Sequence, residues 1–278
     1  MKIEELELRS EKNRKRLMEI IFNAKAGHVG GDLSCLNVLT VLYLDTLKVD
    51  PKNPKDDNRD RFVMSKGHCV EALYTVLEDK GFLKPEVTDT LGKFGSILSG
   101  HPTIEVPGIE ANSGALGHGL SIGVGMAIAA KMDNKSYKTF VLMGDGEQGE
   151  GSIYEAAMAG NQYKLDNLVA IIDRNHLQIS GNTEDVMAID DISNRWSAFG
   201  WDIKEMNGDN IEDIVKTLAS IDYNSRKPHL IVSHTTKGKG VSYMENVAKW
   251  HHGIPSQEQY DEAIKEISER INKLENNK

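Results

Sequence analysis

Short apolar runs alternate with longer amphipathic stretches along this 278-residue chain. Each run stops abruptly at glycine or polar residues, as buried strands of a parallel sheet do. The pattern predicts strands at 61–64, 140–143, 168–172, 200–206 and 229–234, and helices at 3–25, 34–47, 70–80, 113–132, 211–221 and 256–278. This alternation, without a Pro/Gly/Ser-rich linker, predicts a single α/β domain over 1–278, a doubly wound parallel sheet flanked by helices.

The stretch from 139 to 177 reads as a strand–helix–strand unit around a Gly-Asp-Gly turn. Its first strand ends at Asp145 of that turn, and its second ends just before Asn175. Ser152 and Glu155 have the spacing of a capping box, which predicts that the helix between the strands starts at Ser152. Because ligands bind at the carboxyl ends of parallel strands, Asp145 and Asn175 are candidate ligand-binding residues.

Oxygen donors at this edge of the sheet suit a hard divalent cation. The Asp145 carboxylate, the Asn175 amide oxygen and a free backbone carbonyl match the ligands of Mg²⁺ or Ca²⁺. The glycines beside Asp145 allow backbone N–H groups to approach a phosphate closely. These residues predict a metal-bridged diphosphate, and the alternative is a structural Asx turn at a strand end.

Histidines recur beside glycines in the predicted loops. His28, His68 and His101 each follow a glycine, and 250–253 reads Trp-His-His-Gly. If these turns converge on the edge that carries Asp145, they form a cluster that can donate, accept and shuttle protons near neutral pH. Such a cluster beside a diphosphate suits a substrate with several hydroxyls and a carbonyl.

Glycines also lie inside the predicted 113–132 helix, at Gly119, Gly123 and Gly125. Each costs about 1 kcal/mol relative to alanine, so a ligand or another helix is expected to pack very close there. The 34–47 helix is expected to be capped by Asp32 or Ser34.

The composition restricts the classes of binding partner and the cellular compartment that are expected for this chain. Lys+Arg 33 against Asp+Glu 42 gives a formal net charge of −9 without a basic stripe, so neither nucleic acid nor a membrane is an expected partner. Cys35 and Cys69 lack metal-type spacing and are expected to be buried, reduced thiols. The charged N-terminus is not expected to act as a signal peptide, and no window holds about 18 uninterrupted apolar residues. A cytoplasmic protein is expected.

Six motifs resemble, in order, the N-terminal half of transketolases over almost the whole chain. The resemblance implies the thiamine-diphosphate-binding fold and the transfer of a two-carbon ketol unit from a ketose (phosphate) to an aldose (phosphate). The implied cofactors are thiamine diphosphate and Mg²⁺ (or Ca²⁺). The motifs are Ala26-Gly27-His28, Ser65-Lys66-Gly67-His68, Gly100-His101-Pro102, Ser113-Gly114-Ala115-Leu116-Gly117, Gly144-Asp145-Gly146 with Asn175 after 28 intervening residues, and Lys237-Gly238-Lys239-Gly240.

The resemblance also implies a role for each matching residue. Asp145, Asn175 and the backbone carbonyl of Leu177 would hold the cation. His28, His101 and His251 would bind the donor ketose and assist proton transfer. Glu150 and Glu155 resemble acidic residues near the subunit interface, and a plain helix cap is the alternative for Glu155. The residues that would bind the cofactor are His68, Gly114, Leu116, Asp145, Gly146, Glu150, Asn175 and His251.

Three positions depart from the family pattern. His118 stands where glutamine is common and is expected to be structural. The Trp-His-His-Gly sequence has one histidine more than usual, and His251, adjacent to Trp250, is preferred over His252 as the active-site residue. Asp32 lies near the expected donor site, where it would alter donor choice or merely cap a helix.

Length is the largest departure, because nothing here corresponds to the family's pyrimidine-binding and C-terminal domains. Those domains carry the glutamate that protonates the aminopyrimidine of the cofactor. The chain is therefore expected to be inactive alone and to join a C-terminal transketolase subunit in an α2β2 heterotetramer. Three alternatives stay open: a related enzyme that acts on an unusual ketose or resembles 1-deoxyxylulose-phosphate synthase, a non-catalytic thiamine-diphosphate-binding module, and a Mg²⁺-dependent phosphohydrolase built on Asp145.

Overall fold

A five-stranded parallel sheet forms the centre of the molecule, in a computed structural model that describes residues 1–189 and 191–276. The strand order is β1-β2-β3-β7-β6, and all neighbouring pairs are parallel. The predicted α/β fold with a parallel sheet is confirmed. The strands are β1 (Arg61–Met64), β2 (Thr139–Gly144), β3 (Leu168–Arg174), β6 (Asp202–Asn207) and β7 (His229–His234), and a small antiparallel hairpin joins β4 (Leu177–Gln178) to β5 (Gly181–Asn182).

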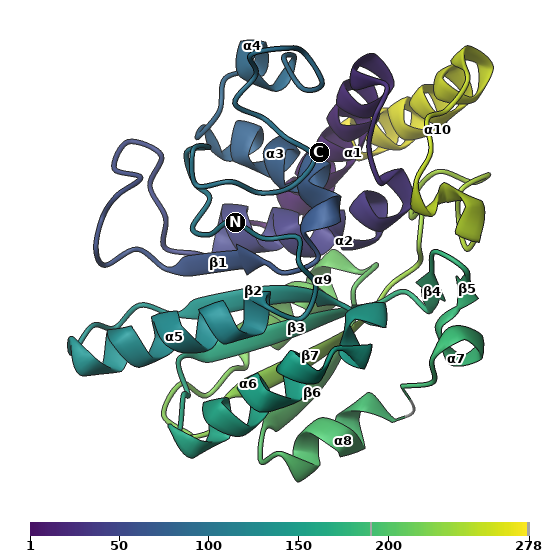
Figure 1. Ribbon diagram of the computed structural model, residues 1–278. Helices are drawn as coiled ribbons and strands as arrows, with labels where there is room; N and C mark the ends of the chain where they lie inside the picture. The colour runs from purple at the N-terminus through teal and green to yellow at the C-terminus, as the bar shows by residue number, and fades with distance from the viewer. Residues whose placement is uncertain (190, 277–278) are drawn as a thin grey trace.

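Helices cover both faces of this sheet (Figure 1). The helices that lead directly into β2 and β3 lie on one face, and the return of the chain from β6 to β7 reverses the direction of winding. Because such crossovers are right-handed, the helix of that return lies on the opposite face. One face carries α1 (Ile3–Ala24), α2 (Val29–Val41), α3 (Val70–Lys80), α9 (Ile211–Ala219) and α10 (Gln257–Asn276), and the other carries α5 (Gly119–Met132), α6 (Gly151–Gln162) and α8 (Ile192–Ala198).

Two apolar cores follow from this layering, one on each side of the sheet. All seven residues of β3 are buried, which explains why its sequence is a continuous apolar run rather than an alternating one. Both cysteines are buried free thiols, as expected. Within 1–189 and 191–276, the structure contains no helix with the length and apolar character needed to cross a bilayer.

Two expected helix starts are wrong. α2 begins at Val29 rather than Ser34, and His28 rather than Asp32 or Ser34 occupies its N-cap. The helix expected from 113 begins only at Gly119. Residues before it form a loop, in which two glycines take φ angles of +130° and +86° that a right-handed helix does not allow (Gly114 and Gly117).

The capping box expected at Ser152 and Glu155 is also wrong. α6 begins at Gly151, and its N-cap residue Glu150 makes no side-chain cap hydrogen bond. The Ser152 hydroxyl instead donates to the carbonyl oxygen of Gly117 at 2.9 Å. The hydroxyl therefore joins α6 to the preceding loop. The predicted helix at 256–278 corresponds to α10, and positions 277–278 lie outside the described residues.

Close packing explains two of the three glycines in α5. A Cβ at Gly119 would overlap Ser65, and a Cβ at Gly123 would overlap Val141 Cγ2 of β2. Gly125 faces open space, so the expectation of a close neighbour is wrong for that position.

A matched pair of substitutions in α5 distinguishes the effect of packing on the free energy of unfolding from the effect of helix propensity. Gly123→Ala is expected to lower the free energy of unfolding by about 1–3 kcal/mol, because the methyl group must displace Val141. Gly125→Ala is expected to raise it by up to about 1 kcal/mol, because alanine is the better helix former and meets nothing. Urea unfolding of the isolated chain measures both, and equal effects of the two substitutions would contradict the packing explanation.

Candidate active site

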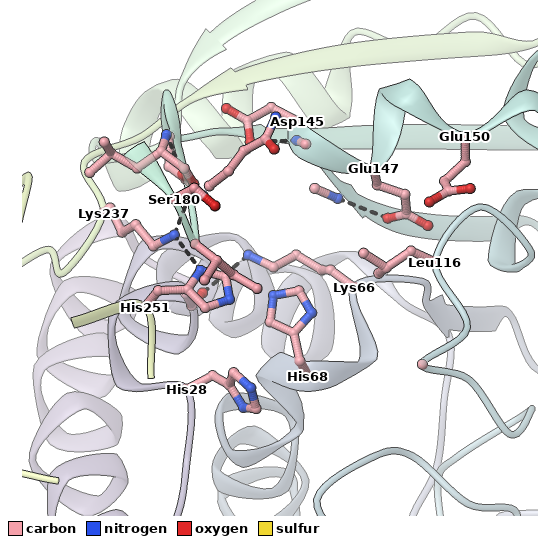
Figure 2. A pocket seen from close by; sticks show the side chains of 18 of the residues that line it. His28, Lys66, His68, Leu116, Asp145, Glu147, Glu150, Ser180, Lys237 and His251 are labelled. Carbon is pink, nitrogen blue, oxygen red and sulfur yellow. Dashed lines mark hydrogen bonds between the residues drawn. The ribbon is translucent and has the colours of Figure 1, made fainter. Parts of the chain in front are cut away.

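A cavity of about 470 Å³ opens at the carboxyl ends of β1, β2, β3 and β7 (Figure 2). The structure brings every site residue expected from the sequence to the wall of this cavity. These residues are His28, His68, His101, Gly114, Leu116, Asp145, Gly146, Glu150, Asn175, Leu177 and His251. The adjacent strands β2 and β3 carry the Gly-Asp-Gly turn and Asn175, with Gly144 opposite Asp173 in the register.

Asp145 follows β2 and is almost fully buried. Its Oδ1 accepts the N–H of Gly146 at 2.7 Å, and its Oδ2 accepts the N–H of His176 at 2.8 Å. Arg174 also donates to Oδ2 at 3.2 Å. Burial raises the pKa of Asp145, and the neighbouring Asp173 carboxylate adds to this effect. A cation bound here would favour the ionised carboxylate that burial disfavours.

Asn175 is oriented by bonds on both sides of its amide. Its Nδ2 donates to Asp173 Oδ2 at 2.9 Å, and its Oδ1 accepts the N–H of Leu177 at 3.1 Å. Between Asn175 and Leu177, the backbone of His176 has a φ of +63°, an unusual value for a residue other than glycine. This turn holds the Asn175 side chain and the Leu177 backbone at the cavity wall.

A buried ion pair lies next to that turn and is hydrogen-bonded to it. Lys66 bonds to Asp173, and both side chains are almost completely buried. Burial alone would lower the pKa of Lys66, but the Asp173 carboxylate outweighs it and raises that pKa well above its usual value. Asp173 also accepts the hydroxyls of Ser34 at 2.6 Å and Thr235 at 2.5 Å. The pair therefore ties α2, β1, β3 and β7 together beneath the cavity.

Lys237 provides a second cation at the cavity wall. Its ammonium group donates to the carbonyl oxygen of Leu177 at 2.8 Å and to Nδ1 of His251 at 2.8 Å. Burial, assisted by the Lys66 ammonium, lowers the pKa of Lys237 to about 8. Because Nδ1 of His251 accepts this bond, the ring proton lies on Nε2.

The histidines form a compact cluster opposite Asp145 in Figure 2. Ring centroids of His28 and His68 lie 5.2 Å apart, and those of His68 and His251 lie 5.4 Å apart. Burial lowers the pKa of His28 to about 4 and, with the Lys237 ammonium, that of His251 to about 3. Burial also lowers the pKa of His101. The rings of His28, His101 and His251 are therefore neutral near pH 7 and can accept as well as donate a hydrogen bond.

Of the residues that depart from the family pattern, only His251 lines the cavity, whereas His118, His252 and Asp32 do not. His118 is exposed, with its ring bonded to the Leu116 carbonyl, and does not line the cavity. His252 lies beside His28 at 4.8 Å between centroids, but only His251 is among the lining residues. Asp32 is fully buried within α2, where its Oδ1 accepts the N–H of Ala72 in α3.

The far wall is built from backbone and from a carboxylate that the sequence analysis did not select. Gly114 lies so close to His101 that a Cβ at Gly114 would overlap the imidazole. The buried carboxylate of Glu147 accepts the N–H groups of Gly117 at 2.7 Å and Gly144 at 3.0 Å, which fixes the loop that carries Leu116. The cavity lining that sequence analysis missed consists of Gly31, Lys66, Gly144, Glu147, Gln178, Ile179, Ser180 and Lys237.

These donors fit a hard cation bound together with a diphosphate. The carbonyl of Leu177 already faces a positive charge, the ammonium of Lys237. Across residues 1–189 and 191–276, no group of three or more His, Cys, Asp or Glu side chains could hold a metal ion. A cation held by Asp145, Asn175 and Leu177 would therefore take its other ligands from the diphosphate and from water, as Mg²⁺ commonly does.

The hydrogen bond between Lys237 and His251 predicts a change in the pKa of His251 that can be measured. Lys237→Met removes the ammonium group but keeps an unbranched apolar side chain, so the pKa of His251 is expected to rise from about 3 while staying below its ordinary value of 6.5, because burial persists. Titration of ¹³C-labelled histidine by NMR measures this shift. Lys239→Met, which changes a half-buried neighbour paired with Asp209, serves as the control and should leave the pKa of His251 unchanged. An unchanged pKa in Lys237→Met would contradict the assigned contact.

Comparison with known proteins gives consistent matches over the chain. The family model described as "Transketolase, thiamine diphosphate binding domain" matches residues 9–271. The chain is 75% identical over 275 residues to an apulose-4-phosphate transketolase subunit of Phocaeicola vulgatus, covering 99% of this chain and 98% of that protein. It is 42% identical to the protein of the same name from Actinobacillus succinogenes, covering 96% and 97% of the two chains.

A solved structure matches the fold over the full length. The transketolase from Leishmania mexicana superposes with a TM-score of 0.86 at 28% identity. The match covers 100% of this chain and 45% of that one, so this chain spans less than half the length of that protein.

Proposed function

This chain belongs to the transketolase family, and we propose that it is the N-terminal subunit of a two-chain transketolase that holds the diphosphate end of thiamine diphosphate. The proposal is carried by the convergence of site residues from positions 28 to 251 on one cavity of about 470 Å³ at the sheet edge. We take residues 1–278 as one pyrophosphate-binding domain.

The cofactor contacts follow from the groups that line the cavity. Asp145, Asn175 and the Leu177 carbonyl would hold Mg²⁺ (or Ca²⁺) on the diphosphate. The diphosphate oxygens would also be bound by Gly146 N–H and by His68 and His251, and the buried Lys66 and Lys237 add positive charge. Gly114, Leu116 and Glu150 would contact the pyrimidine end. When bound, thiamine diphosphate supplies the nucleophilic carbon and the electron sink for ketol transfer.

The histidines would act on the sugar. His28, His101 and His251 are expected to be neutral near pH 7, so each can accept a hydroxyl proton or donate its own ring proton to a sugar oxygen. The Nε2–H of His251 is available for donation, because Nδ1 is occupied by Lys237. Their common position opposite Asp145 would orient a ketose against the cofactor.

The proposed substrate and partner come from the names of two relatives, the proteins from Phocaeicola vulgatus and Actinobacillus succinogenes. Identity of 75% over nearly the whole length favours apulose 4-phosphate as the donor ketose. Both relatives are named as one subunit of a transketolase, which favours a separate chain that carries the pyrimidine-binding and C-terminal domains. Such a chain would supply the glutamate that protonates the aminopyrimidine, and we propose an α2β2 assembly with active sites between unlike chains.

The experiment compares this chain alone with this chain mixed with the product of the neighbouring reading frame. Ketol transfer from apulose 4-phosphate is measured with thiamine diphosphate and Mg²⁺, and light scattering gives the assembly mass. The isolated chain is expected to be at least about a thousandfold less active, because half of the catalytic groups are absent. Full activity of the isolated chain would overturn the two-chain proposal, and equal rates with common ketose phosphates would overturn the donor assignment.

A further inference from the structure

Two carboxyl groups lie buried together behind the histidine cluster, outside the cavity lining. Asp32 of α2 is 0% exposed and Glu71 of α3 is 2% exposed. Asp32 Oδ1 accepts the N–H of Ala72, the residue that follows Glu71, so the two carboxyl groups lie close together. Neither is among the residues assigned above to the cation, the cofactor or the sugar.

The contact between the two carboxyls requires a proton. Asp32 Oδ2 and Glu71 Oε2 are buried and receive no bond from an N–H or O–H group in the described parts of the chain. Two neighbouring ionised carboxylates buried away from water would repel each other strongly, whereas one shared proton would join them by a strong hydrogen bond. A pair that shares one proton carries a single negative charge.

That charge faces the first turns of two helices. Asp32 Oδ1 accepts the N–H of Ala72, in the first turn of α3. The Glu71 carboxyl faces the backbone N–H of His28, the N-cap residue of α2. Helix N-termini carry partial positive charge and unpaired N–H groups, so a carboxylate shared between them stabilises both.

The same two turns carry histidines of the cavity. His28 stands at the start of α2, and Asp32 follows one turn later, with its N–H bonded to the His28 carbonyl at 3.0 Å. His68 precedes α3, three residues before Glu71. The imidazoles of His28 and His68 lie 5.2 Å apart.

We propose that Asp32 and Glu71 are positioning residues that, as a carboxyl pair sharing one proton, fasten the start of α2 to the start of α3 and thereby set the spacing of His28 and His68 for the sugar. This inference deepens the proposed function and rests on it for the role of the histidines. The pair itself can be tested without any catalytic assay.

The shared proton makes the pair sensitive to alkaline pH. Burial raises the pKa of Glu71 to about 8, above its ordinary 4.5. The proton on Glu71 therefore stabilises the folded chain fully below about pH 4.5, and this stabilisation is lost as the pH rises through about 8. The other titratable groups that face the pair are the Cys69 thiol and the Lys66 ammonium.

The first arm of the test uses the full isolated chain. Glu71→Gln keeps an N–H donor for Asp32 at every pH, so its Tm is expected to fall by about 5 °C less than that of the wild type between pH 6 and 9. Cys69→Ser removes the thiol and should keep the wild-type fall. NMR of ¹³C-labelled histidine is expected to show His28 and His68 shifted in Glu71→Ala and unshifted in Glu71→Gln. Equal pH dependence of Glu71→Gln and wild type would overturn the shared proton.

The second arm uses the assembled two-chain enzyme. Glu71→Ala is expected to raise KM for the ketose about tenfold and to leave the cofactor Kd within about twofold, because the histidines that bind sugar move and the cation ligands do not. Glu71→Gln should restore KM to within about twofold. Asp79→Asn, which breaks an ion pair with Arg9 at the other end of α3, is the control and should not change KM.

The two arms distinguish failure of this inference from failure of the proposed function. An unchanged KM in Glu71→Ala, or an equal rise in Glu71→Gln, would overturn the positioning role. If the wild-type complex transfers no ketol group, the proposed function fails, while the histidine spectra and the Tm profile still decide whether the carboxyl pair positions His28 and His68.

Discussion

Asp145→Ala is expected to reduce kcat of the assembled enzyme at least about a hundredfold and to abolish Mg²⁺-dependent binding of thiamine diphosphate. Asp145 is the only carboxylate in the proposed ligand set of Asp145, Asn175 and the Leu177 carbonyl, so its loss removes the negative charge that this set presents to the cation. Loss of partners outside the coordination shell alone typically costs about ten- to a hundredfold. Calorimetric titration of cofactor and Mg²⁺, together with steady-state rates, measures both effects.

The design must separate loss of the cation from loss of structure. Removal of the Asp145 carboxylate also leaves the N–H groups of Gly146 and His176 without their present acceptor. Asp145→Asn keeps an oxygen for one of them and should fold better while still binding Mg²⁺ poorly. Asp133→Ala, at the far end of α5, is the control with full activity. Wild-type cofactor affinity in Asp145→Asn would contradict the metal assignment and favour the structural turn.

Strand positions and the family could be predicted from the sequence because both depend on local signals. Short apolar runs bounded by polar turns located β1 and β7 with the observed bounds and β2 and β3 within two residues at each end. The ordered motifs identified the transketolase family, which the matches confirm. Carboxyl ends of neighbouring parallel strands must share an edge, so the meeting of Asp145 and Asn175 followed from topology alone.

The sequence analysis did not recognise glycines that are required by a close contact with a residue distant in the sequence. Gly30 and Gly31 precede the helix predicted at 34–47, but both lie inside α2. A Cβ at Gly30 would come within 2.6 Å of the Trp250 carbonyl oxygen, and one at Gly31 within 2.6 Å of Cys69 Sγ. A sequence shows that a glycine is present, and only the tertiary contact shows whether a turn or a close neighbour requires it.

The lysines of the site were missed for a related reason. Lys66 and Lys237 stand in motifs that the sequence analysis recognised, Ser-Lys-Gly-His and Lys-Gly-Lys-Gly, yet a lysine in a loop is usually solvated. Their burial depends on Asp173 and on the Leu177 carbonyl, which come from another part of the chain. A lysine beside a glycine at the end of a buried strand is the local signal that could have identified both.

Lys66→Met is expected to destabilise the isolated chain by about 3–5 kcal/mol, which corresponds to a fall in Tm of roughly 10 °C. The substitution leaves the Asp173 carboxylate buried without its counter-ion, and the remaining hydroxyl and amide donors of Ser34, Thr235 and Asn175 compensate only in part. Urea and thermal unfolding measure the loss.

The surface pair of Lys131 and Asp166 provides the control for this prediction. Its lysine side chain is 40% exposed, whereas that of Lys66 is 2% exposed, although both lysines bond to a carboxylate. Lys131→Met should therefore cost at most about 1 kcal/mol. Restoring neutrality in the double substitution Lys66→Met with Asp173→Asn should recover part of the lost stability, because the uncompensated buried charge disappears. If Lys66→Met and Lys131→Met cost the same, burial does not determine the strength of the Lys66–Asp173 pair, and the fold does not depend on it.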